Sequence, residues 1–169
     1  SCMKVLDVEP TDKISSDIAI RDKVGIERAI IGSYTALQAA GLYGRNRGIV
    51  GDLAADNLTW TGTTFEYLQM ENNEIPAENG ILEGAWIASY DGLNNVLYKL
   101  PEITDLTPAE RDKFEGEALF MRALFHFNLL SYYGGIPLKT MPTLIISNVD
   151  QERNTPDQVY EQVIADLLG

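Results

Sequence analysis

The feature that most constrains the fold is one long helix whose two ends are both marked in the sequence. Thr107-Pro108-Ala109-Glu110 supplies an N-cap hydroxyl, a proline at the first helical position and a glutamate three residues after the cap. Gly134-Gly135 marks the end, because glycine readily adopts the left-handed conformation needed beyond a helix. Residues 118–130 are apolar nearly all round. We therefore predict a helix over 107–133 that is the central and most buried element.

Three further helices are predicted around it. A second cap of the same kind, Thr155-Pro156-Asp157-Gln158, begins a helix that continues to the end of the sequence. Apolar residues at helical spacing predict helices from 23 to about 40 and over 81–100. The helices over 81–100 and 107–133 are joined by a short loop, so they should form an antiparallel hairpin. We predict an all-α, mainly helical fold of tetratricopeptide-like hairpins with long irregular loops, although no clean repeat of about 34 residues is present.

The remaining segments are less regular. Residues 1–22 are interpreted as an extended leader on the surface, and 23–169 as the helical domain. Residues 45–79 predict a helical turn or two around 49–57 and then a long loop, of a length that is usually functional or disordered. Residues 136–149 predict extended chain packed on the helices, with one short strand pair as an option. The apolar stripe of the last helix either packs back on the other helices or awaits further residues.

Charge and composition exclude several classes of partner. The formal net charge is −12, and nucleic acids and anionic membrane surfaces would both repel such a chain. No apolar run is long enough to cross a bilayer. The single cysteine, Cys2, and the single histidine, His126, supply neither an internal disulfide nor a cysteine-based zinc site. We expect no metal and no cofactor.

No arrangement of residues indicates catalysis. His126 lies in the most apolar helix without a nucleophile motif, so we interpret it as a core histidine rather than a base. A glycosidase needs two carboxylates facing one sugar, but pairs such as Asp52 with Asp56 arise by chance among 25 acidic residues. The glycines from Gly41 to Gly51 match no phosphate-binding loop. We predict that the chain is not an enzyme.

The irregular region combines aromatic side chains with short polar ones. Sugars are bound by an aromatic face against the C–H surface of the ring and by planar amides and carboxylates at the hydroxyls. Trp60, in a polar loop, is poorly placed for a core role. The alternative, that Trp60 and Tyr67 only anchor the loop to the helices, is slightly favoured for any single residue. The candidate ligand-binding residues are Tyr43, Arg45, Asp56, Asn57, Trp60, Tyr67 and Asn72.

The cysteine stands at an unusual position. Cys2 follows the small residue Ser1, and bacterial lipoproteins are cut immediately before a cysteine preceded by a small residue. The thiol would then carry a lipid. The alternative is a buried or incidental thiol, and a dipeptide alone does not decide between the two.

Three segments of the chain match sequence patterns of one known family. Residues 116–129 (GEALFMRALFHFNL) and 133–138 (YGGIPL) are similar to its pattern GEA-x-x-x-RA…YG-x-(V/I)P. The second match, to R-x-(S/T)-x-x-E-(V/I)-Y…I-x-x-D-L, consists of Arg153, Thr155, Val159, Tyr160, Ile164, Asp166 and Leu167. The third, to W-x-x-x-Y-x-x-(I/L)-x-x-A-N, consists of Trp86, Tyr90, Asn94 and Asn95. With Gly32-x-Tyr34 and the Ser1-Cys2 start, the chain resembles the amino-terminal part of the SusD/RagB family, whose members are considerably longer.

The resemblance implies a function. Members of this family are outer-membrane, surface-exposed, lipid-anchored proteins that capture a glycan or another nutrient and work with a SusC-like TonB-dependent transporter. It favours lipidation of Cys2 over the alternatives. A second hypothesis is a helical-repeat interaction module that binds the transporter or another protein and no small ligand. Neither the glycan nor the oligomeric state follows from the sequence.

The family signature residues themselves are interpreted as structural. We expect Arg122 to pair with a carboxylate of a neighbouring helix, and Thr155 to act as a cap. Trp86 and Tyr90 should fill space between helices. These positions therefore predict the fold rather than the ligand.

Overall fold

The structure is a computed structural model in which residues 19–87, 91–142 and 151–169 are described. Helices account for all of the regular structure in these residues, and none of them forms a strand. The elements are α2 (Lys23–Leu37), α3 (Asn46–Ala54), α4 (Phe65–Glu71), α5 (Gly80–Ile87), α6 (Asp91–Lys99), the 3₁₀ turn η2 (Leu100–Glu102), α7 (Pro108–Tyr133) and α8 (Pro156–Leu168). The predicted all-α fold is confirmed. None of these helices combines the length and apolar character needed to cross a bilayer.

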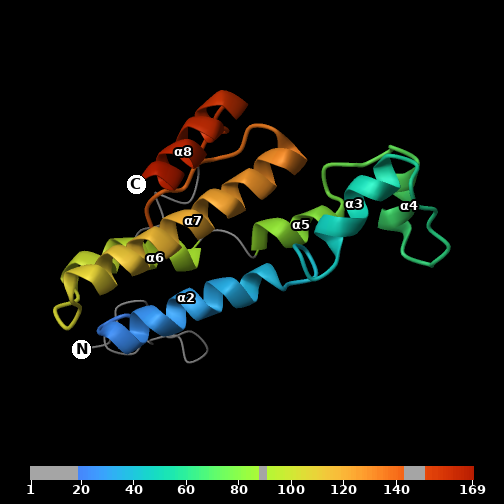
Figure 1. Cartoon of the computed structure of the whole chain (residues 1–169). Helices are drawn as coiled ribbons and strands as arrows, with labels where there is room; N and C mark the ends of the chain where they lie inside the picture. Colours follow the sequence, from blue (N-terminus) through green and yellow to red (C-terminus); the bar gives the residue numbers. More distant parts are fainter. Residues whose placement is uncertain (1–18, 88–90, 143–150) are drawn as a thin grey trace, which may run out of the picture.

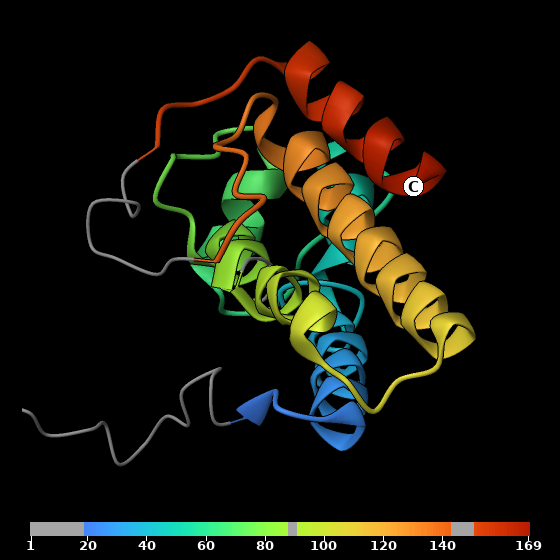
Figure 2. The same cartoon turned by 90° about the vertical axis from the view of Figure 1, so that its left-hand side faces the viewer.

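Helix α7 is the centre of the molecule, as predicted. It has 26 residues, and α8 lies along one side of it while α6 and α2 lie on another (Figures 1 and 2). Thr107 and Glu110 form the predicted reciprocal capping box. The helix ends at Gly134, whose φ of 68° is the left-handed conformation that glycine adopts without strain. His126 is 2% exposed, and burial lowers its pKa to about 4, as expected for a core histidine.

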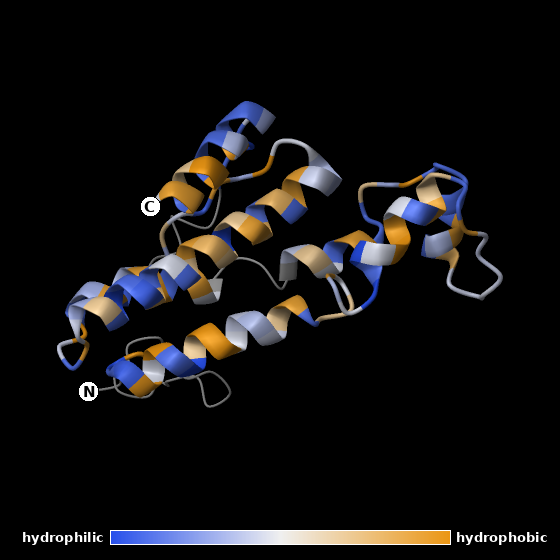
Figure 3. Cartoon of the chain, viewed as in Figure 1, coloured by the Kyte–Doolittle hydropathy of each residue, from blue (hydrophilic) through white to orange (hydrophobic). Residues whose placement is uncertain are grey.

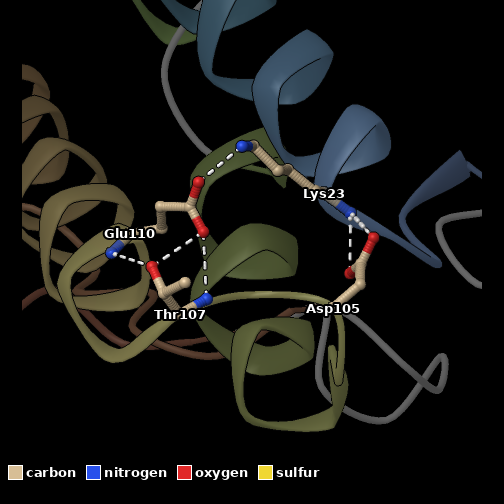
Figure 4. Close-up of polar contacts among 4 residues, drawn as sticks. All are labelled: Lys23, Asp105, Thr107 and Glu110. Carbon is tan, nitrogen blue, oxygen red and sulfur yellow. Dashed lines mark hydrogen bonds and ion pairs between the residues drawn. The ribbon is translucent and has the colours of Figure 1, made fainter.

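The start of α2 is docked against the start of α7 (Figure 4). Asp22 caps α2 by accepting a hydrogen bond of 2.8 Å from the backbone N–H of Gly25. The backbone N–H of Lys23 donates to Asp105, and its Nζ lies 2.5 Å from Oε1 of Glu110. The same Glu110 caps α7, so one carboxylate serves both helix ends.

A buried network around Arg122 joins α7 to α8 and α6. Its Nε and Nη2 donate to the two carboxylate oxygens of Asp166 at 2.8 and 2.7 Å. Its Nη1 donates to Oδ1 of Asn94 at 3.2 Å and to the carbonyl of Thr140 at 3.1 Å. The predicted pairing of Arg122 with a carboxylate on a neighbouring helix is confirmed. Three signature residues from separate segments of the chain therefore meet at one point.

Two other predictions about signature residues can be compared with the structure. Thr155 forms a capping box with Gln158 at the start of α8, as predicted. The ring of Trp86 lies 5.2 Å from that of Tyr133, between α5 and α7, and fills space there as expected. Tyr90 lies outside the described residues. The helix predicted over 81–100 is present as α5 and α6, on either side of residues 88–90, which are likewise not described.

The expected long loop over 45–79 is wrong in part. Helix α3 begins at Asn46 and ends at Ala54, and a further helix, α4, lies within the supposed loop. The physical reason is a second, small apolar core that consists of Val50, Leu53, Tyr67 and Met70. Since Tyr67 and Met70 are one helical turn apart, a short helix brings both onto α3. We call residues 43–79 the α3–α4 lobe; it lies at one end of the molecule (Figure 1).

The segments at the edges of the predicted helices are partly described. Ile136 is fully buried, and the residues after it pack on the helices as predicted, with Asn154 donating to the Ile136 carbonyl. No strand forms over 136–142, and the rest of the expected extended segment, 143–149, is outside the described residues. Cys2 and most of the predicted leader are also outside. Ile20, however, is 6% exposed and belongs to the main core, so the end of the supposed surface leader is buried.

Helix α8 uses only part of its apolar surface. Val159 and Val163 are buried. A second apolar stripe on the helix is exposed, and it consists of Tyr160, Ile164, Leu167 and Leu168. Hydrophobic residues, coloured orange, recur along both α7 and α8 in Figure 3. One half of the apolar face of α8 therefore packs back on the other helices, and the other half is exposed in this structure.

Candidate ligand-binding surface on the α3–α4 lobe

Tyr67 is the centre of the candidate surface. Its side chain is 3% exposed and belongs to the small core of the lobe. The ring of Trp60 lies against it, with centroids 4.5 Å apart and planes inclined by 44°. The guanidinium carbon of Arg45 lies 5.8 Å from the centroid of the same ring. Three of the seven predicted residues, Arg45, Trp60 and Tyr67, are therefore in contact.

Trp60 is held firmly by its surroundings. Its backbone N–H donates to Oε2 of Glu71 at 2.8 Å, which fixes the loop to the end of α4. The backbone of Gly62 lies on the indole, since a Cβ on Gly62 would come within 2.4 Å of the ring. The indole Nε1 is covered and forms no hydrogen bond within the described residues. Trp60 anchors the loop, as the alternative interpretation has it, and its side chain stays partly exposed.

The predicted polar residues gather where α3 and α4 end. Asn73 donates from Nδ2 to the carbonyl of Ala54 at 3.3 Å, which ties the ends of the two helices together. Asp56 and Asn57 follow α3 directly, and Asn72 is the C-cap of α4. All three are exposed. Planar amide and carboxylate groups thus stand at the same end of the lobe as the bond from Trp60 to α4.

Tyr43 is held elsewhere. Its hydroxyl donates to Oδ1 of Asn128, a fully buried residue of α7, at 3.2 Å. Arg47 donates from Nε to the same oxygen at 2.8 Å, and its guanidinium carbon lies 5.2 Å from the ring centroid of Tyr132. Tyr43 is half exposed, but its contacts are to α7 rather than to the Trp60 and Tyr67 pair.

The structure adds residues that the sequence did not reveal. Asn46 is 3% exposed and accepts hydrogen bonds from both Tyr67 and Arg45. Arg47 fastens the lobe to α7, and Glu71 fixes Trp60. No spacing rule predicts the contact of Asn46 with Tyr67, of Arg47 with Asn128 or of Glu71 with Trp60, because each joins residues from different segments of the chain. The only available signal is the polar run Arg45-Asn46-Arg47 within an apolar region.

The two arginines of the lobe differ from Arg122 in their electrostatic environment. In the described part of the chain, neither Arg45 nor Arg47 forms an ion pair, whereas Arg122 is paired with Asp166 at 2.7 Å. Arg45 is also exposed. In a chain with a net charge of −12, the lobe therefore presents hydrogen-bond donors that no carboxylate of the described residues occupies.

The chain is similar to known proteins over nearly its whole length. Residues 4–169 match a SusD-like family described as "Starch-binding associating with outer membrane". SusD-like protein P38 of Formosa agariphila is 28% identical over 172 residues, which cover 99% of this chain and 33% of that protein. The surface glycan-binding protein A of Bacteroides uniformis has a TM-score of 0.72 and 28% identity, with 83% of this chain and 32% of that one covered.

A second solved structure supports the same fold. A SusD superfamily protein from Bacteroides vulgatus superposes with a TM-score of 0.76 at 21% identity, and the match covers 87% of this chain and 33% of that protein. The chain thus spans about a third of the length of the relatives it matches. Because the family match extends over nearly the whole chain and the helical fold agrees, this protein belongs to the SusD-like family.

Proposed function

We propose that this chain is part of a cell-surface glycan-binding lipoprotein that works with a TonB-dependent transporter of the outer membrane. The observation that carries the proposal is the contact of Arg45, Trp60 and Tyr67 on the α3–α4 lobe, in a chain of the SusD-like family. The Bacteroides uniformis relative is named as a surface glycan-binding protein, which supports the same function here.

The chemistry of the lobe suits sugar recognition. Trp60 is partly exposed, and an indole is an aromatic surface of the kind that binds the C–H face of a sugar ring. Arg45 offers N–H donors, and Asp56, Asn57 and Asn72 offer acceptors and donors for hydroxyl groups. Such a surface binds without cleaving, since neither an exposed nucleophile paired with a base nor two carboxylates across a cleft accompany these residues in the described part of the chain.

Ligand binding is tested by fluorescence titration with a panel of soluble polysaccharides. The two tryptophans are separated by substitution, and in Trp86→Phe the remaining signal comes from Trp60. We expect at least one glycan to shift the fluorescence emission of Trp86→Phe. Calorimetry should then detect no binding of that glycan to Trp60→Ala. Trp86→Phe itself serves as the matched control, because Trp86 packs on Tyr133 away from the lobe. No response to any glycan of a broad panel would refute the proposal.

The tether and the transporter are tested on the native protein. We expect mass spectrometry to find diacylglycerol on Cys2, and a bare amino-terminal cysteine would remove the lipid anchor from the proposal. We expect the full-length protein to co-purify with an outer-membrane transporter from detergent extracts. The genes that neighbour its own give an independent test, since adjacent transporter and glycosidase genes would identify the polymer.

The exposed apolar stripe on α8 favours a second function, that of a protein-interaction module. Ile164, Leu167 and Leu168 are 53%, 55% and 82% exposed and lie close together on the helix. Grouped exposed apolar side chains of this kind are typical of interaction sites. Charged substitution separates the two functions. If Ile164→Glu abolishes co-purification with the transporter and no glycan binds, the interaction module is correct. If glycan binding is retained in the same variant, the lobe acts as proposed.

A further inference from the structure

We propose that Asn46 is the positioning residue of the ligand surface. Its single side-chain oxygen accepts hydrogen bonds from Tyr67, on which Trp60 packs, and from Arg45, whose donors the proposed function places against the glycan. The role in affinity rests on that function. The role in holding the aromatic pair does not, because it is visible in the protein without ligand.

Two donors occupy the side-chain oxygen of Asn46. Oδ1 lies 2.7 Å from the hydroxyl of Tyr67 and 3.1 Å from Nε of Arg45. An amide oxygen has two lone pairs, so both donors are accommodated at once. Asn46 is 3% exposed, so water cannot readily replace either bond.

The other end of the amide fixes Asn46 to the body of the protein. Nδ2 donates to the carbonyl of Ile81 in α5 at 3.1 Å. Asn46 is also the first residue of α3. One side chain therefore connects three helices: its own, α4 through Tyr67, and α5 through Ile81. The position of the Tyr67 ring is set from the scaffold rather than from the surrounding loop.

This arrangement has a consequence for each partner. With its hydroxyl fixed, Tyr67 presents a defined face to Trp60, whose ring centroid is 4.5 Å away. With Nε engaged, Arg45 keeps its guanidinium over the Tyr67 ring, and its terminal nitrogens form no hydrogen bond among the described residues. A guanidinium held in this way loses less conformational freedom when a ligand binds, which favours affinity.

The inference is tested with Asn46→Leu, which removes the amide oxygen at similar volume, and with Asn46→Asp, which keeps an oxygen acceptor for both donors. Both are made in the Trp86→Phe background, so that fluorescence reports Trp60 alone. Without ligand, we expect acrylamide quenching of Trp60 to rise at least twofold in Asn46→Leu and to rise less in Asn46→Asp, which keeps the two acceptor bonds and loses only the Nδ2 bond to Ile81. Circular dichroism confirms that the variants are folded. If Asn46→Leu unfolds, Tyr67→Phe removes one of the two bonds and should change quenching in the same direction.

Glycan affinity gives the second measurement. We expect the dissociation constant to rise at least tenfold in Asn46→Leu and to rise less in Asn46→Asp, which loses only the bond to Ile81. Because Asn46 acts through Arg45, the double variant with Asn46→Leu and Arg45→Gln should lose much less glycan affinity than the product of the fold-losses of the two single variants. A purely structural role would give losses that multiply.

The outcomes separate this inference from the proposed function. If the parent binds no glycan but Asn46→Leu exposes Trp60, the proposed function fails and the positioning role stands. If quenching of Trp60 is unchanged in both Asn46→Leu and Tyr67→Phe, the positioning role is refuted, whether or not a glycan binds. Multiplying losses in the double variant would also refute it.

Discussion

The buried ion pair between Arg122 and Asp166 allows a quantitative test of what holds this fold together. The side chains are 12% and 3% exposed, and the two hydrogen bonds between them measure 2.8 and 2.7 Å. Removing one partner of such a pair costs about 3–5 kcal/mol, because the other charge is left buried without compensation. In Asp166→Ala the guanidinium keeps the acceptors of Asn94 and Thr140, so we expect the lower end, about 3 kcal/mol.

The assay is unfolding by urea and by heat, followed by circular dichroism. For a chain of 169 residues, a loss of 3 kcal/mol corresponds to a decrease in Tm of about 6–12 °C. The control is Glu117→Gln on α7, whose partner Lys113 lies 3.8 Å away with a side chain that is 66% exposed; this change should cost less than about 0.5 kcal/mol. The double variant Arg122→Met with Asp166→Leu should recover most of the loss, since no charge then remains buried. If Asp166→Ala and Glu117→Gln lower the free energy of unfolding by the same amount, the reasoning is wrong.

Three further predictions concern pH and backbone conformation. The hydrogen bond from Lys23 and the bonds from Thr107 lower the pKa of Glu110 to about 2. Glu110 is therefore still ionised in the folded state at pH values below its ordinary pKa. Its contribution to stability is complete above about pH 4.5 and is lost as the pH falls toward 2. Urea midpoints in this pH range should fall less in Glu110→Gln than in the parent. Burial lowers the pKa of His126 from 6.5 to about 4, so the unfolded chain binds the extra proton first, and stability should fall by about 3 kcal/mol between pH 6.5 and 4. A His126→Gln variant with the same slope in a pH series of urea titrations would contradict this. Gly134→Ala should lower the free energy of unfolding by about 1 kcal/mol because the φ of Gly134 is 68°. Gly116→Ala within α7 should raise it by up to about 1 kcal/mol, because an added Cβ there meets nothing within 4 Å. Equal effects of the two changes in thermal melts would argue against the conformational explanation.

The elements that were predicted correctly have local signals. Helices α7 and α8 begin with Thr107 and Thr155, whose capping boxes involve residues only three positions apart. A contact of that kind depends on the sequence nearby and on little else. The pairing of Arg122 was predictable because a buried arginine needs a carboxylate, although the identity of Asp166 needed the three-dimensional fold.

Helix α4 was missed because its stability comes from elsewhere. It has seven residues, too few to be stable as an isolated helix. Its buried residues, Tyr67 and Met70, pack on Val50 and Leu53 of α3 across a connection with few apolar residues. Such a helix is a consequence of tertiary packing, and the composition of the surrounding segment favours the wrong interpretation as a loop. Asn46 was missed for the same reason, since its partners Tyr67 and Ile81 are distant in sequence.

The positions of the Arg122 network and of the α3–α4 lobe explain why the family is easier to recognise than the ligand. Arg122, Asp166 and Asn94 lie in the contact between α6, α7 and α8, where loss of Arg122 or of Asp166 alone leaves the other charge buried and unpaired, so their chemistry is narrowly constrained. The α3–α4 lobe has its own apolar core, and hydrogen bonds join it to α5 through Asn46 and to Asn128 of α7 through Arg47. Exposed residues such as Asp56 and Asn72 can change without disturbing either core. If the lobe binds the ligand as proposed, the scaffold fixes where that surface is built, and the exposed residues of the lobe determine what it binds.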